Sequence, residues 1–163
     1  MRNRKILFVL LIFIIALSML AAQSATGDPR VKKTLERLGL NYQISKSGNF
    51  TETYNIENSD RTHMVTIKSQ TEMYRGIEIR EIFAIAAALD DYPPDELVYR
   101  MMEENSTLKL GAWAMEADSS GVYIYFTTKI PADVRDNDLK YYSYFVAEIA
   151  DEMEEELLGT DDF

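Results

Sequence analysis

The segment KLGAWAMEADSSGVYIYFTTKIPAD, residues 109–133, decides the fold because it contains two alternating stretches joined by a short polar turn. Residues 111–115 and 122–126 alternate with the period of two of a strand, and ADSSG at residues 117–121 has the composition of a turn. One face of the second stretch carries Val122, Ile124 and Phe126, and the other carries Tyr123 and Tyr125. The pattern predicts an antiparallel hairpin with a core-facing side and an outer side covered by tyrosine rings, whose hydroxyl groups stay in water.

The same period of two continues upstream of this hairpin. Tyr42 and Ile44 alternate with polar neighbours, a looser alternation follows through residues 50–56, and Val65 and Ile67 continue it. The turn-like segments KSGN and ENSD separate these stretches. We therefore expect an antiparallel meander with one face against a core.

Residues 76–89 are ambiguous, because Ile77 and Ile79 alternate with charged residues whereas residues 82–89 are apolar throughout and rich in alanine. Periodicity alone does not distinguish a strand from a helix in such a run. Phe83, Ile85 and Leu89 keep the parity of a strand, which favours a strand here.

Three segments have helical spacing. Asp28 and Pro29 suit an N-cap and a first helical position, and a helix is expected to end at Gly39. A second helix is predicted around residues 92–105, and a third from about Asp136 to Leu158. In the third, the seam is formed by Leu139, Tyr142, Val146, Ile149, Met153 and Leu157. Asp136 or Asp138 is expected to be its N-cap.

These elements define an α+β fold in which helices pack on one face of an antiparallel β-sheet, in the order α-β-β-β-(β)-α-β-β-α. The chain has 163 residues, and its length fits one domain. That domain is assigned to residues 25–163.

Residues 1–24 read as a secretory signal peptide. Arg2, Arg4 and Lys5 precede an apolar run that begins at Ile6, and small residues follow it. The run is also near the lower limit for a membrane span, so an uncleaved N-terminal anchor is the alternative. Either way the domain is expected to be exported, as a periplasmic or secreted protein or held at the membrane.

The chain has 17 basic and 27 acidic residues, a net charge of −10. Cleavage after residue 24 leaves 14 basic and 27 acidic residues, a net charge of −13. Such an acidic surface repels phosphate backbones, so nucleic acid is not an expected partner, and binding to anionic lipid is discouraged. No cysteine is present, which excludes disulfides and cysteine-based sites.

No segment carries a recognisable catalytic motif. His63 is the single histidine and opens a predicted strand, so we expect a structural role for it, and a zinc site is not expected. Glu78 and Glu81 are the best candidates for paired catalytic carboxylates, but they fall on opposite sides of a regular strand. Asp136 and Asp138 lack the glycine and glutamate that an EF-hand loop requires. No metal, cofactor or catalytic residue is therefore predicted.

Three segments carry a family resemblance: HMVTIKSQTEMYRGIEIREIFAIAA at residues 63–87, ENSTLKLGAWAM at residues 104–115 and VAEIADEMEEELLGTDDF at residues 146–163. In them the chain resembles the YbjN-like family of bacterial sensory transduction regulators. The resemblance implies a fold like that of type III secretion chaperones, a protein-binding rather than enzymatic role, and a dimer. Many members of that family look cytoplasmic, whereas this chain carries a predicted export signal.

The sequence thus predicts a non-catalytic, exported module that binds a protein or peptide in a regulatory or chaperone-like role, as a homodimer. Its candidate binding residues are Tyr123 and Tyr125 on the outer sheet face, Tyr141 and Tyr144 on the last helix, and the group Arg75, Glu78 and Arg80. Two alternatives stay open: a carboxylate-dependent hydrolase of the cell envelope, and a structural subunit of an envelope assembly.

Overall fold

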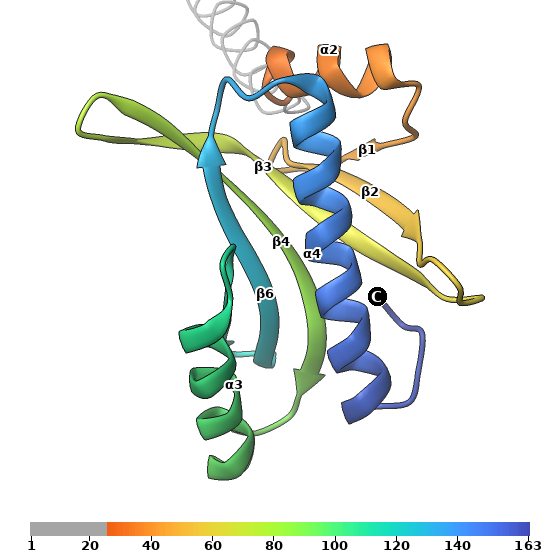
Figure 1. The fold of residues 1–163 in the computed structure, drawn as a ribbon, viewed down its shortest axis with the longest axis vertical. Helices are drawn as coiled ribbons and strands as arrows, with labels where there is room; N and C mark the ends of the chain where they lie inside the picture. Colours follow the sequence, from red (N-terminus) through yellow and green to blue (C-terminus); the bar gives the residue numbers. More distant parts are fainter. Residues whose placement is uncertain (1–25) are drawn as a thin grey trace, which may run out of the picture.

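A computed structural model describes residues 26–163, and the predicted leader at residues 1–24 lies outside the described residues (Figure 1). The elements, in chain order, are α2 (Pro29–Leu38), β1 (Gln43–Ile44), β2 (Phe50–Asn55), β3 (Thr62–Tyr74), β4 (Ile77–Leu89), α3 (Asp95–Thr107), β5 (Ala112–Asp118), β6 (Gly121–Pro131) and α4 (Asp136–Leu157). This order confirms the predicted succession of helices and strands. Among residues 26–163, no helix combines the length and the apolar character needed to cross a membrane.

The strands form one antiparallel sheet in the order β1-β2-β3-β4-β6-β5. The ambiguous segment at residues 76–89 is strand β4, as its parity predicts. Burial alternates along β4: Ile82 and Ala84 are buried on one face, while Phe83 and Ile85 are half-buried on the other. On its other side β4 pairs with β6 and not with β5, the next strand along the chain. The pairing of β4 with β6 therefore joins the meander β1–β4 to the hairpin β5–β6.

The helices lie on one face of the sheet, which confirms the predicted α+β arrangement. Helix α4 crosses β3, β4 and β6, and α2 packs against α4 (Figure 1). Helix α3 packs beside β5 at the sheet's end, where Trp113 donates from Nε1 to Glu104 at 2.7 Å. Trp113 is buried and lies edge-on to Phe126, with 5.1 Å between ring centroids.

Small side chains let α4 approach the sheet closely. Ala147 and Ala150 on the helix and Ala84 on β4 are buried in the same core cluster as Val146 and Phe126. Each large apolar side chain buried there contributes about 1.5–3 kcal/mol relative to exposure. Because the chain has no disulfide, this core carries the stability of the domain.

Gly111 shows how tightly the β5–β6 corner is built. Its φ is +76°, and a Cβ at this position would lie 2.7 Å from ring atoms of Phe126 and from the carbonyl oxygen of Thr127. Only glycine fits both the left-handed backbone and this close approach. Gly111 therefore fixes the entry into β5.

The predicted N-cap of α2 is confirmed, whereas the predicted N-cap of α4 is not. Asp28 caps α2 as expected and accepts from the Arg30 backbone N–H at 2.8 Å. The expected cap of α4 is wrong, because the N-cap is Arg135 and no side chain bonds there. Asp136 instead accepts from Thr34 Oγ1 at 2.8 Å and from Arg37, which ties α4 to α2.

Candidate functional site: the open face of the sheet

The face of the sheet opposite the helices carries a row of half-buried side chains. Tyr123 and Tyr125 of β6 lie on this face, while Val122, Ile124 and Phe126 are buried beneath it, as the sequence predicts. The two tyrosines line a hollow of about 230 Å³ together with Lys68, Phe83, Ile85, Glu116 and Asp118. These residues come from strands β3, β4, β5 and β6, so the hollow exists only once the sheet has formed.

Lys68 in the lining of the hollow forms an ion pair with the neighbouring Glu81, which also binds a hydroxyl group. Lys68 Nζ donates to Glu81 at 2.6 Å, and Thr127 Oγ1 donates to the other carboxylate oxygen at 2.9 Å. The hydrogen bond to Glu81 raises the pKa of Lys68. Burial would raise the pKa of Glu81, but the bonds from Lys68 and Thr127 outweigh it and lower that pKa. Both groups are therefore charged at neutral pH.

The apolar part consists of aromatic rings beside that charge. Phe83 and Tyr125 meet edge to face with 5.8 Å between centroids, and Lys68 Nζ lies 5.5 Å from the Phe83 centroid. Burial, followed by the charges of Glu81 and Glu116, raises the pKa of Tyr125, so its hydroxyl keeps its proton. Rings at the floor with acids at the rim can receive an apolar side chain that is followed by a basic one.

Five residues of this hollow were not predicted as binding residues: Lys68, Phe83, Ile85, Glu116 and Asp118. Their parity in the sequence shows which side of a strand each occupies, and that signal was available. The missing information was the strand order, because only the pairing of β4 with β6 brings Phe83 next to Tyr125.

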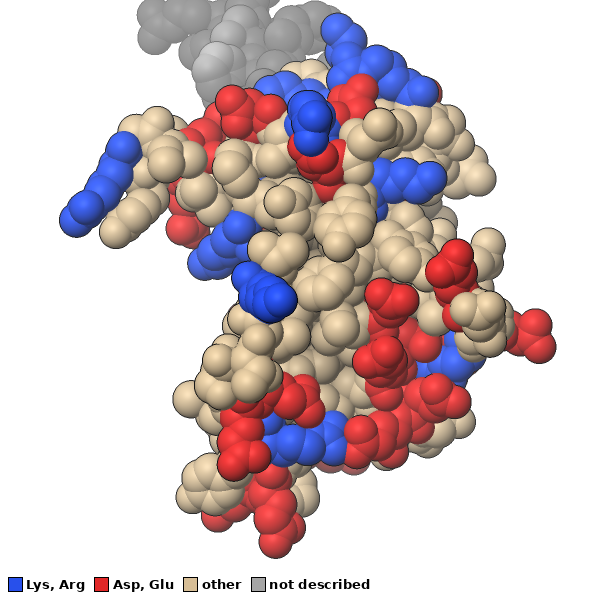
Figure 2. All heavy atoms as spheres, viewed as in Figure 1, with Lys and Arg blue, Asp and Glu red and all other residues tan. Residues whose placement is uncertain are grey.

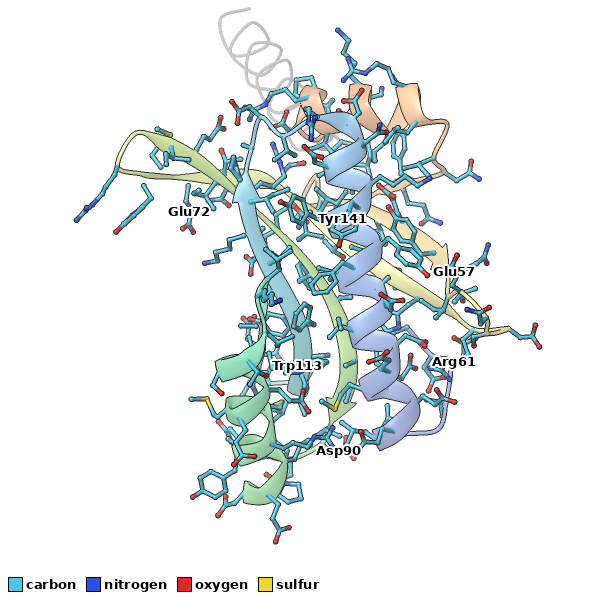
Figure 3. The ribbon with its side chains drawn as sticks, in the orientation of Figure 1. Glu57, Arg61, Glu72, Asp90, Trp113 and Tyr141 are labelled. Carbon is cyan, nitrogen blue, oxygen red and sulfur yellow. The ribbon has the colours of Figure 1, made fainter. Side chains whose placement is uncertain are left out.

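The predicted tyrosines of the last helix lie elsewhere. Tyr141 is 62% exposed on α4, away from the sheet (Figure 3). Tyr144 is half-buried: its hydroxyl accepts from the Glu57 backbone N–H at 3.1 Å, and its ring packs edge-on to Tyr54. Tyr144 thus joins α4 to the end of β2, and the helix tyrosines do not extend the open face.

The predicted group of Arg75, Glu78 and Arg80 does not form one exposed patch. Arg80 is 1% exposed and pairs with Asp28 at 2.5 Å, which places it inside the domain rather than on a binding surface. Glu78 is bound at 2.7 Å by Arg30, and Arg75 lies at the tip of the β3–β4 hairpin. Parity alone could not tell the helix-covered side of β4 from the open side.

Glu78 and Glu81 lie on opposite faces of β4, as a regular strand requires. Arg30 and Thr71 bind the carboxylate of Glu78 and lower its pKa to about 2, whereas Glu81 belongs to the open face. The two carboxylates therefore do not face a common substrate.

A second cluster of charged groups lies under the start of β3, near the labelled Arg61 (Figure 3). Arg61 donates from Nε to Asp151 at 2.8 Å and contacts Glu154 at 3.3 Å. His63 is fully buried, with Nδ1 3.3 Å from Glu154 and 3.8 Å from Asp151. These four side chains bring two acids, an arginine and the single histidine together inside the domain.

The ligand atoms of His63, Asp151 and Glu154 all lie within 4.8 Å of one another, a spacing that a metal ion could use. The Arg61 guanidinium already supplies the positive charge there, so the cluster reads as a structural tie between β3 and α4. Glu154 also accepts from the Asp162 backbone N–H at 2.6 Å, and the Phe163 carbonyl accepts from Met64 at 3.1 Å. The cluster thereby fastens the segment after α4 to β3.

His63 bridges two strands where their ladder has ended. The registered pairs of β3 with β4 begin at Thr66 and Phe83, and before that point His63 Nε2 bonds to the Ile85 carbonyl at 2.9 Å. A carbonyl only accepts, so Nε2 carries the proton. Burial lowers the pKa of His63, against the opposing charge of Glu154, and the imidazole is neutral at pH 7.

This arrangement predicts a pH dependence of stability. The folded-state pKa of His63 is below the unfolded value of 6.5, so below pH 6.5 the unfolded chain takes up a proton that the folded chain refuses. The free energy of unfolding should therefore fall as the pH falls below 6.5, with a limiting slope of about 1.4 kcal/mol per pH unit. Urea titrations at stepwise pH measure it.

The control is His63→Gln, which keeps an N–H for the Ile85 carbonyl but does not titrate. It should flatten the curve near pH 6, while the fall below pH 4.5 stays, because that limb belongs to carboxylates such as Glu78, whose folded pKa is lowered to about 2. An unchanged slope near pH 6 would show that His63 is not the titrating group.

Comparison with known proteins supports the fold alone. No family model and no curated protein matches the sequence. Among solved structures, the crystal structure of YbjN from E. coli, a proposed transcription regulator, matches with a TM-score of 0.50 and 10% identity, over 78% of this chain and 88% of that chain. The chain therefore has a YbjN-like fold, which confirms the fold expected from the resemblance.

Proposed function

We propose that this protein is an exported, non-catalytic module that binds another protein or a peptide through the open face of its sheet, in a regulatory or chaperone-like role. The observation that carries the proposal is the aromatic hollow lined by Phe83, Tyr123 and Tyr125, on the sheet face that no described helix covers. A homodimer is part of the proposal.

The chemistry of the hollow favours recognition over conversion. Its basic group, Lys68, is paired with Glu81, and Tyr125 keeps its proton because its pKa is raised, so neither group is poised as a nucleophile. Half-exposed aromatic rings with a polar rim are typical of the energetic centres of protein interfaces. The YbjN-like fold is compatible with this role, since the matched protein is described as a proposed regulator.

The rim defines the kind of partner. Glu116 and Asp118 are exposed beside the rings, and no ion pair within 4 Å is found for them among the described residues. Their negative charge complements a peptide in which an apolar or aromatic side chain lies next to a lysine or arginine.

Capture of the partner provides the test. A photo-crosslinking residue in place of Ala114, which pairs with Tyr125 and leaves both rim acids in place, should yield a protein adduct in the native cell that mass spectrometry identifies. Tyr123→Ser with Tyr125→Ser should weaken this capture at least about ten-fold, because interface tyrosines are frequent hot spots. Near-UV circular dichroism checks that the variant is folded.

The matched control is Tyr92→Ser with Tyr99→Ser, which removes two tyrosines that are 65% and 68% exposed near and on α3. That variant should keep the adduct. Absence of an adduct, or equal capture by both double variants, would refute the open face as the binding surface. Light scattering on the same preparations tests the homodimer, which a monomeric mass at micromolar concentration would remove.

A further inference from the structure

The β3–β4 hairpin projects beyond the rest of the sheet (Figure 1). On one side β2 pairs with β3 only as far as Ile67, and on the other β6 pairs with β4 only from Ile79. The segment from Met73 to Ile77 is therefore a two-stranded ribbon with no third strand. Its turn is Arg75-Gly76, with φ values of +49° and +87°, and two positive φ values suit a tight hairpin.

This ribbon exposes large apolar side chains. Met73, Tyr74 and Ile77 are 69%, 64% and 53% exposed, and the Arg75 guanidinium lies 5.6 Å from the Tyr74 ring centroid. Tyr74 and Ile77 are directly paired across the hairpin, so they share one side of it. An isolated hairpin is marginally stable in water, and exposed apolar tips usually have a counterpart to contact.

Charge is segregated along the molecule (Figure 2). Helix α2 has four basic residues and one acidic residue, whereas residues 147–163 have eight acidic residues and no basic one. Blue atoms lie around α2 and at the hairpin tip with red atoms between them, whereas red atoms dominate the end formed by α3 and the second half of α4. Helix α2 thus carries a net charge of +3 within an acidic chain, and this local charge can attract anionic lipid.

The described chain begins at the same end. The Asp28 backbone N–H donates to Ser69 Oγ of β3 at 2.9 Å, and Arg30 pairs with Glu78 of β4 at 2.7 Å. The first described residues thus lie against the base of the hairpin. In the sequence, the apolar run that starts at Ile6 precedes them, and it has the composition of a segment that enters membranes.

We propose that the hairpin tip and the exposed basic side of α2 form a docking surface for an anionic phospholipid bilayer. Met73, Tyr74 and Ile77 enter the interfacial layer, Arg75 stays at headgroup level, and Lys32 and Lys33 face the lipid phosphates. The acidic end points away from the membrane, because the surface potential repels it. The open face of the sheet is then presented beside the membrane, free to bind its partner.

This inference rests on the proposed export only because export brings the domain to a membrane. The experiment supplies the membrane directly, so its failure would leave partner binding by the open face untouched. Likewise, a failure of the crosslinking at Ala114 would leave the lipid contact untouched.

The natural absence of cysteine allows a direct test on the full chain. Met73→Cys and, as a matched control, Met102→Cys each receive a polarity-sensitive fluorophore; Met102 is 64% exposed on α3, at the acidic end. The proteins are reconstituted in vesicles of phosphatidylcholine with or without phosphatidylglycerol. The buried Trp113 reports that each labelled chain is folded.

The label at residue 73 should shift to shorter wavelength and be quenched by lipid-borne nitroxide in phosphatidylglycerol vesicles, and salt should reverse both effects. The label at residue 102 should show neither effect. Lys33→Gln should reduce the ratio of docked to undocked hairpin about five-fold, while Lys109→Gln, on the loop after α3, should leave it unchanged.

Equal signals from residues 73 and 102 would overturn the proposal. The proposal would also be overturned if the signal at residue 73 changed with the protein-to-lipid ratio but was the same with and without phosphatidylglycerol. That result would indicate that a second copy of the chain covers the hairpin.

Discussion

Arg61→Gln is expected to lower the free energy of unfolding by about 3–5 kcal/mol, a large part of the stability of a domain of this size. The arginine is the cation of a buried cluster, and its removal leaves the carboxylates of Asp151 and Glu154 without charge compensation. Arg61 also donates to the Thr160 carbonyl, so the segment after α4 loses a tie to β3. Urea unfolding followed by the fluorescence of Trp113 measures the change.

Arg135→Gln is the matched control. Its side chain is 86% exposed and pairs with Asp138 one helical turn away. Exposed pairs of this kind contribute about 0–1 kcal/mol, so this variant should unfold close to the unchanged protein. A second variant, Arg61→Gln with Glu154→Gln, should recover part of the loss because one buried charge is removed. Equal stability of Arg61→Gln and Arg135→Gln would refute a structural role for the cluster.

Arg80→Met is expected to cost a similar amount, about 3–5 kcal/mol. Arg80 is buried and donates to Asp28 and to the backbone carbonyls of Lys68 and Ser69. Burial would raise the pKa of Asp28, but the hydrogen bonds from Arg30 and Arg80 hold it well below its usual range. The variant therefore leaves an ionised aspartate and two carbonyls short of a donor where α2 meets the hairpin.

A double-mutant cycle separates the ion pair from simple loss of packing. Asp28→Asn keeps a side-chain oxygen for the cap of α2 and removes the charge. In the Arg80→Met background this second change should cost less than it does alone, with a coupling of about 1–3 kcal/mol. Strictly additive losses would show that Arg80 acts through its packing and not through the pair.

Together these tests divide the molecule into parts with different roles. The clusters around Arg61 and Arg80 lie inside the domain and hold β3 and β4 to α4 and α2. The half-exposed rings of Phe83, Tyr123 and Tyr125 line a hollow on the side of the sheet that no described helix covers. Variants of the first kind should change stability, and variants of the second kind should change binding.

Much of the local structure could be predicted from the sequence. The period of two placed Tyr123 and Tyr125 on the outer face and Ile124 on the inner one, and the helical seam identified Val146 and Met153 as core residues. The assignment of residues 76–89 to a strand also followed from parity. Each of these inferences depends only on neighbours within one element, where backbone geometry fixes the direction of every side chain.

The candidate site could be predicted only in part. The expectation that Arg80 contributes to a binding surface failed because its strand face is the one that α2 and α4 cover. Phe83 and Lys68 were missed because they belong to strands that become neighbours of β6 and β4 only in the folded sheet.

The sequence by itself determined which segments are helices and strands and which of their sides face the core, because side-chain direction repeats with the local backbone period. Only the tertiary structure decided that β4 lies beside β6, that Arg61 meets Asp151 at a distance of 90 residues along the chain, and that the basic groups share an end with the hairpin tip. Such contacts follow from strand pairing and from the way α4 crosses the sheet. Both are settled by the packing of the whole core rather than by any local pattern.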